Sequence, residues 1–122
     1  MKHYLHNSLR ALALSLAVLL SLPLLAGQVM INGIIYELDA DTKEASVIAK
    51  SSGKYSGNVV IPESVEFKGI TYRVTSIGQN AFYKCYGLTS VTIPNSVVII
   101  GQDAFSDCSG LKSVHIYDIA AW

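Results

Sequence analysis

The chain has 122 residues, enough for one small domain, and its nine basic side chains balance nine acidic ones. No basic run or stripe is present, so a phosphate backbone finds no complement and nucleic acid is excluded as an expected partner. Lys2 and Arg10 are the only charged residues before Gly27, which leaves seven basic and nine acidic side chains for the rest of the chain.

Residues 1–27 have the layout of a secretion signal. Lys2 and Arg10 form a positive n-region, residues 11–22 form an apolar h-region, and a proline precedes small residues. Cleavage is expected after Ala26 or Gly27. The alternative is an uncleaved membrane anchor, although about 16 apolar residues fall short of the roughly 20 that a span needs. The sequence therefore predicts an exported protein with no membrane span once the signal is removed.

Residues 28–57 are predicted to form a β-rich N-terminal cap. Asn32 and Gly33, flanked by apolar segments, are a strong short signal for a β-hairpin. A polar turn then leads into a predicted strand at residues 45–49. Such a cap would shield the open edge of the array that follows.

Residues 78–94 and 101–117 are two copies of one repeat. Their sequences, GQNAFYKCYGLTSVTIP and GQDAFSDCSGLKSVHIY, are identical at ten of seventeen positions. The step from residue 78 to residue 101 is a 23-residue period, which lies in the range of leucine-rich repeats. Leu88, Val91 and Ile93 have the spacing of a strand with one buried face. Each copy is therefore predicted to be one coil of a solenoid, which must stack on its neighbours.

A less regular copy precedes these two. Residues 59–65 echo residues 91–97, but nine additional residues follow before the pattern resumes. Within this stretch, residues 67–74 alternate around Lys68 and Gly69, which predicts a second β-hairpin. The predicted fold is mainly β with short helical turns. It consists of a solenoid of 23-residue coils over residues 58–122, with one irregular and two regular coils, behind the β-hairpin cap.

The run I-P-x-S-V-x-x-I-G-x-x-A-F-x-x-C-x-x-L-x-S-V-x-I, found at residues 93–116, resembles the BspA-like leucine-rich repeat of bacterial surface proteins. Residues 61–93 carry the same run with the insertion. Members of that family are typically exported proteins, and where a role is known it is adhesion to host or matrix proteins or to other cells. The resemblance implies a secreted or cell-surface protein-binding module. It implies neither an enzyme nor a cofactor.

One departure from the family pattern is Tyr117, which stands where the preceding copy has Pro94. A solenoid needs about three repeats and a closing cap. The alternative prediction is therefore a truncated structural remnant with no binding activity, whose open C-terminal edge would allow self-association. In a further alternative, Ile119 and Trp122 fold back as a small cap.

Cys85 and Cys108 hold the same place in successive copies. Neighbouring strands lie about 4.8 Å apart, but in-register Cβ atoms lie further apart than the ~3.8 Å that a disulfide prefers. A buried, reduced thiol ladder is expected, with a disulfide as the alternative. No further cysteine or histidine is spaced for zinc, so no metal site is predicted.

The predicted binding surface is a strip of outward strand residues, because curved solenoids bind through such faces. Its members are Thr89, Ser90, Thr92, Lys112, Ser113 and His115. Tyr83 and Tyr86 lie between copies, where exposed tyrosines favour protein or glycan contacts; packing against the cap or the next loop is the alternative. His115 has no predicted base beside it, so no catalytic residue is predicted. The expected partner is an extracellular protein or glycan.

Overall fold

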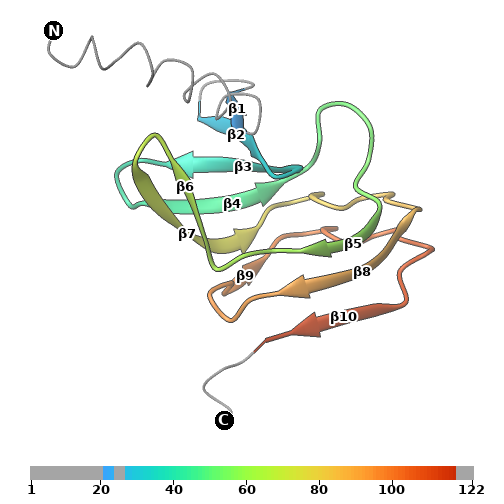
Figure 1. Cartoon of the computed structure of the whole chain (residues 1–122). Helices are drawn as coiled ribbons and strands as arrows, with labels where there is room; N and C mark the ends of the chain where they lie inside the picture. The colour runs from blue at the N-terminus through green and yellow to red at the C-terminus, as the bar shows by residue number, and fades with distance from the viewer. Residues whose placement is uncertain (1–20, 24–26, 118–122) are drawn as a thin grey trace, which may run out of the picture.

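The computed structural model describes residues 21–23 and 27–117, and nearly all of its regular structure is β (Figure 1). Within these residues, ten strands form two sheets. Of the predicted signal, residues 1–20 and 24–26 lie outside the described residues, and Ser21–Pro23 is the short strand β1. Within the described part, the chain has no helix of the length and apolar character that a membrane crossing requires.

The prediction of short helical turns is wrong. Residues 79–87 and 102–110 form hydrogen-bonded turns and no helix. The backbone gives the reason, because Asn80, Lys84, Asp103 and Asp107 have positive φ angles of 59°, 57°, 56° and 59°. A right-handed helix cannot continue through a left-handed residue. Each segment has two left-handed residues four positions apart, and it therefore forms a series of tight turns in place of a helix.

The larger sheet is curled and contains seven strands. Its order is β1 (Ser21–Pro23), β2 (Gln28–Ile31), β3 (Ile34–Asp39), β4 (Glu44–Ile48), β7 (Ile70–Ile77) and β6 (Ser64–Phe67), and β9 (Ile99–Ile100) also pairs with β7. Neighbours from β1 to β4 are antiparallel, as are β6 and β7, whereas β4 and β9 run parallel to β7.

Both predicted hairpins are confirmed. Ile31 lies opposite Ile34, and the Asn32–Gly33 turn between them has φ angles of 49° and 84°. The Lys68–Gly69 turn between β6 and β7 has φ angles of 52° and 79°. Two successive positive φ angles are the signature of the type I′ turn, whose twist matches that of the flanking strands.

The smaller sheet consists of the parallel strands β5 (Gly57–Val60), β8 (Leu88–Ile93) and β10 (Ser113–Ile116). Residues of β8 and β10 that pair with each other, such as Val91 and Val114, are one repeat period apart in the sequence. Ser76 of β7 and Ile99 of β9 also pair and have the same separation. Val59 of β5 pairs with Val91, which lies one period and nine further residues along the chain. These nine residues match the insertion seen in the sequence, and they fall in the segment that carries the β6–β7 hairpin.

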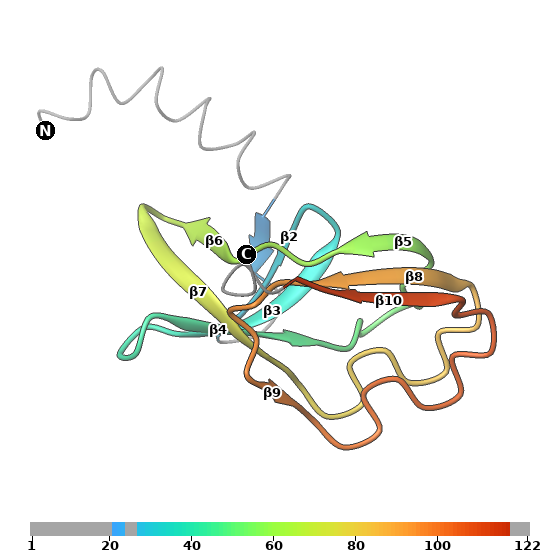
Figure 2. The ribbon, with the colours of Figure 1, turned by 90° about the horizontal axis from the view of Figure 1, so that it is seen from below.

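The hydrophobic core lies between the two sheets and the turns that connect them (Figure 2). Phe82 is fully buried near its centre, where its ring stacks on Phe105 with a centroid distance of 5.1 Å and an interplanar angle of 3°. Tyr55 packs against the same ring at 4.9 Å. The two phenylalanines occupy the same position in successive copies, so the repeat period sets this stack.

The core is open at β10, the last strand of the smaller sheet. Val91 and Ile93 of β8 are 0% and 2% exposed, whereas their partners Val114 and Ile116 of β10 are 43% and 68% exposed. Ile99 of β9, at the same end, is 62% exposed. Among the described residues, no strand covers the outer edge of β10.

Candidate binding surface

The outward face of the smaller sheet carries side chains in two rows across the three strands. One row contains Asn58, Ser90 and Ser113, and the other contains Val60, Thr92 and His115. Side chains on one face of a strand recur every two residues, so in-register parallel strands align them in rows. The hydroxyl of Ser90 donates to Oδ1 of Asn58, which fixes the first row across β5 and β8.

The six residues of the predicted strip lie together. Ser90, Thr92, Ser113 and His115 occupy the two rows. Thr89 and Lys112 lie where the paired segments of β8 and β10 begin, and the backbone N–H of Lys112 donates to the carbonyl oxygen of Thr89 at 2.8 Å. Thr89, Lys112 and His115 are exposed, whereas Ser90, Thr92 and Ser113 are half-buried.

Sequence reasoning missed the third strand of this face. Asn58 and Val60 of β5 extend the two rows, and Val60 is 58% exposed. The signal was present in the sequence, because residues 59–62 echo residues 91–94. Aligning residues 59–62 with residues 91–94 places Asn58 beside Ser90 and Val60 beside Thr92.

The two tyrosines between the copies differ in their surroundings. Tyr86 is 58% exposed and lies two residues before β8. Tyr83 is half-buried, with the ammonium of Lys84 5.3 Å from its ring centroid. Lys54 Nζ donates to the carbonyl oxygen of Tyr83 at 3.0 Å, so its backbone is held by the segment that precedes β5. Of the two, only Tyr86 offers most of its ring to a partner.

Cys85 and Cys108 are both free thiols in the structure. Cys85 is buried, and the Cys108 thiol donates to the carbonyl oxygen of Phe82 at 2.9 Å. Burial raises the pKa of Cys108. A raised thiol pKa lowers the fraction of reactive thiolate at neutral pH. The raised pKa means that Cys108 lacks the activation that a nucleophile needs, and both thiols pack against neighbouring residues.

The described residues contain no cluster of metal-ligating side chains. No group of three histidine, cysteine, aspartate or glutamate side chains gathers there in a way that could hold a metal ion. His115 is exposed on β10. Asp39, whose spacing with Asp41 resembles the start of a calcium loop, instead accepts hydrogen bonds from the backbone N–H groups of Asp41 and Thr42 at 2.9 and 3.2 Å. Those bonds lower the pKa of Asp39 and close the turn before β4.

Comparison with known proteins gives one family and several similar structures. Residues 58–120 match the family model described as "BspA type Leucine rich repeat region (6 copies)". A leucine-rich repeat protein from Bacteroides capillosus is 33% identical with a TM-score of 0.64, over 74% of this chain and 65% of that one. A leucine rich cell surface protein from Faecalibacterium prausnitzii is 34% identical with a TM-score of 0.62, over 75% of this chain and 24% of that one.

A leucine-rich repeat protein from T. pallidum is 32% identical with a TM-score of 0.54, over 66% of this chain and 35% of that one. The present chain thus spans less than two thirds of the length of each of these structures. A comparison with curated proteins found no match.

Proposed function

Because the chain belongs to the BspA-type leucine-rich repeat family, we propose that it is an exported protein-binding module that acts in adhesion at the cell surface. Its contact surface is the outward face of β5, β8 and β10, together with Tyr86. The partner is an extracellular protein or glycan. No catalytic step is assigned to the chain.

The observation that carries this proposal is the in-register polar face. Its rows combine hydroxyl, amide and imidazole groups at matched heights on three parallel strands. The core behind β5 and β8 holds their backbone in place, so little backbone freedom is lost there when a partner binds. Extended faces of this kind are the usual binding surfaces of repeat proteins.

The proposed architecture behind this face is a solenoid of 23-residue coils closed by an N-terminal cap. Two pairs of strands support the period, since β8 with β10 and β7 with β9 are both offset by one repeat. Support for the cap comes from β4, which runs parallel to β7 on the side away from β9. The antiparallel hairpin of β2 and β3 continues from β4 and would end the parallel stacking there. In this proposal, the domain boundaries are 1–27, 28–57 and 58–122.

Export is supported by the charge and hydropathy pattern of residues 1–27 and by the similarity to a protein named as a cell surface protein. Expression of the chain in a bacterial host, followed by mass spectrometry of each fraction, tests it. A product that begins at Gly27 or Gln28 outside the cytoplasm is the expected result. Full-length chain in the membrane fraction would instead favour the anchor.

Binding is tested on an array of purified extracellular-matrix proteins and glycans. The double substitution Ser90→Arg with Ser113→Arg places two bulky charges in one row of the face, and the matched substitution Gln79→Arg places one charge in an exposed turn outside it. We expect the double variant to lose binding to any captured partner, and Gln79→Arg to retain it. Equal binding by both variants would remove the strand face from the proposal. The absence of any captured partner would favour the structural remnant.

A further inference from the structure

A second surface lies along the free edge of β6 and meets the strand face at Val60, which also lines the groove beside this edge. This strand ends the larger sheet and pairs only with β7 among the described residues. Phe67 and Ile70 flank a two-residue turn, so they form a hydrogen-bonded pair, and such pairs alternate along an antiparallel ladder. The bond from Val74 N–H to the carbonyl oxygen of Glu63, at 2.8 Å, continues this alternation.

It follows that Ser64 and Glu66 direct their backbone N–H and C=O groups away from β7. Neither residue has a backbone hydrogen bond on that side within the part of the chain that the structure describes. Both residues are exposed. Unpaired groups on an edge strand are a template for another strand.

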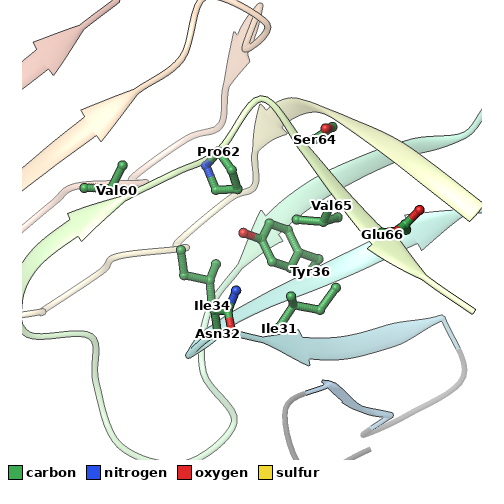
Figure 3. A pocket seen from close by; sticks show the side chains of 9 residues that line it. All are labelled: Ile31, Asn32, Ile34, Tyr36, Val60, Pro62, Ser64, Val65 and Glu66. Carbon is green, nitrogen blue, oxygen red and sulfur yellow. The ribbon is translucent and has the colours of Figure 1, made fainter. Parts of the chain in front are cut away.

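A groove of about 430 Å³ runs beside this edge (Figure 3). The curl of the larger sheet brings β2 and β3 opposite β6, and the groove fills the space between them. Ile31, Ile34 and Val65 supply apolar walls, and Pro62 covers one end. Glu66 is the only charged residue around the groove in the described part of the chain.

The side chain of Tyr36 lines the groove, and Figure 3 shows its hydroxyl directed toward the region between Pro62 and Ile34. The residue is only 1% exposed. Its hydroxyl makes no hydrogen bond to any other described residue. The hydroxyl is not among the described buried polar atoms that lack a partner, so it reaches the solvent of the groove, and a ligand that carries a hydrogen-bonding atom can replace that solvent contact.

We propose that this site binds an extended peptide segment of a partner protein, which adds as a strand to β6 and places a side chain on Tyr36. Strand addition uses the free groups of Ser64 and Glu66 for affinity and the groove for selectivity. Alternation of side chains fixes the pattern of the peptide. The residue opposite Val65 faces the groove, and the residue opposite Glu66 faces outward.

The chemistry of the lining defines both positions. A side chain with a short apolar stem and a hydroxyl, such as threonine, fits the groove, because its methyl group contacts Ile34 and Val65 while its hydroxyl meets that of Tyr36. A lysine or arginine fits the outward position, because opposite charges on facing strands attract. Within the hairpin, Glu66 pairs with Thr71 and Arg73 pairs with Ser64, so no basic residue of β7 stands directly opposite Glu66. The expected partner segment therefore alternates threonine-like and basic residues.

The test uses the full-length ¹⁵N-labelled chain and two blocked peptides, KTKTKTK and KVKVKVK. These differ only in replacing the threonine hydroxyl by a methyl group of nearly the same size. We expect the threonine peptide to bind, to slow hydrogen exchange of the Ser64 and Glu66 amides, and to bind about fivefold tighter than the valine peptide. With Tyr36→Phe, whose fold is checked by its unfolding curve, the two peptides should bind equally.

Charge is tested by Glu66→Lys, which should weaken the threonine peptide about fivefold and bind its glutamate analogue ETETETE instead. Glu37→Lys is the matched control, since Glu37 is exposed on β3 and does not line this groove. The proposal is overturned by a threonine peptide that does not bind at millimolar concentration. It is equally overturned if exchange protection appears on β10, or if the preference for threonine survives in Tyr36→Phe.

Discussion

At the scale of single residues, two buried tyrosines differ in their hydrogen bonding. The Tyr55 hydroxyl accepts the backbone N–H of Ile35 at 2.9 Å and donates to the carbonyl oxygen of Ile48 at 2.7 Å. It thereby ties the segment before β5 to both β3 and β4. The hydroxyl of Tyr36 has no such partners among the described residues.

Replacing each tyrosine by phenylalanine separates these roles. Tyr55→Phe leaves the Ile35 N–H and the Ile48 carbonyl without a partner, so the free energy of unfolding should fall by about 1–3 kcal/mol. Tyr36→Phe removes a hydroxyl that bonds nothing described, and it should change stability by less than about 0.5 kcal/mol. Urea unfolding followed by circular dichroism measures both. Equal losses would show that the Tyr55 bonds do not stabilise the fold.

The same two residues predict a loss of stability in alkali. Burial raises the pKa of Tyr55 to about 12 and also raises that of Tyr36, against an ordinary value of 10.0. A raised folded-state pKa means that the folded protein holds the proton more tightly than the unfolded chain. This contribution is complete below about pH 10, the ordinary tyrosine pKa, and is lost as the pH rises through the folded-state pKa.

The free energy of unfolding should therefore fall above about pH 10, and less steeply in a variant with phenylalanine at both Tyr36 and Tyr55. Urea unfolding at a series of alkaline pH values measures the slope. Unfolding of both chains at pH 7, below the ordinary tyrosine pKa, is the reference from which each slope is measured. The same slope in the parent chain and the double variant would contradict the prediction.

Sequence reasoning at this scale succeeded where the repeat specifies the environment. Leu88, Val91 and Ile93 are buried as predicted, whereas Val114 and Ile116 at the matching positions are exposed, because no described strand covers β10. Neither the Tyr55 bonds nor the position of Tyr36 in the groove was predictable. Both depend on contacts between unrelated segments outside the repeat, for which no periodic signal exists.

At the scale of elements, two glycines allow the turns of neighbouring copies to approach closely, because they have no side chain. A Cβ atom added to Gly110 would lie 2.4 Å from the carbonyl oxygen of Tyr86, in the preceding copy. One added to Gly87, the same repeat position, would lie 3.3 Å from the Ser56 Cβ atom. Neither glycine has a positive φ angle, so the neighbouring segment, and not local strain, restricts both positions.

Alanine at each position tests this difference. Gly110→Ala should destabilise the fold by about 1–3 kcal/mol, because backbone must move to admit the methyl group. The matched variant Gly87→Ala should lose less, because the neighbouring atom belongs to a side chain and stands further away. Chemical denaturation of both variants gives the comparison. A greater loss in Gly87→Ala would mean that the close approach at Gly110 does not govern stability.

Elements could be predicted where the residues of a turn determine its conformation by themselves. Asn32–Gly33 and Lys68–Gly69 identified both hairpins, since two-residue turns of this kind determine their own conformation. The sequence also predicted short helical turns without placing them, whereas residues 79–87 contain the left-handed residues Asn80 and Lys84 and form no helix. Stacking between the copies favours that conformation, as shown by the bond from Phe82 N–H to the Ala104 carbonyl at 2.7 Å.

At the scale of the whole molecule, apolar surface gathers at one end. Six large apolar or aromatic side chains on or beside β9 and β10 are exposed among the described residues, namely Val98, Ile99, Ile100, Val114, Ile116 and Tyr117. A face of this kind together with a free strand edge favours association. The self-association expected from the sequence would use this end.

We predict that sedimentation velocity will show concentration-dependent association. A variant with lysine at both Ile99 and Ile116 should remain monomeric at the same concentrations, because charged residues on an edge strand oppose pairing. Its free energy of unfolding should stay close to that of the parent chain, since both side chains are largely exposed. Val60→Lys, a similarly exposed position on β5, is the control and should still associate. An unchanged association state in the double variant would assign the contact to another surface.

The mainly β character and the repeat family followed from the repeat period, because a repeat encodes the same contacts several times. The solenoid with its cap and the strand-face site stay predictions. The groove beside β6 was not predicted from the sequence. It arises from the curl of the larger sheet, which sets β6 opposite β2 and β3 through the sum of many small strand twists.

The constant offset between paired strands also has a genetic consequence. Because β7 with β9 and β8 with β10 share the same offset, a block of codons one period long can be gained or lost by unequal recombination while every remaining strand keeps its register. Each duplicated block brings its own core phenylalanine and its own turns, so length can drift between strains without any compensating mutation. The segment between β5 and β8 cannot vary in this way. Its offset is longer than one period because it contains the β6–β7 hairpin, and recombination within it would delete or duplicate that hairpin. Natural variation in length is therefore expected to fall after Gly78, with the segment before it kept in single copy.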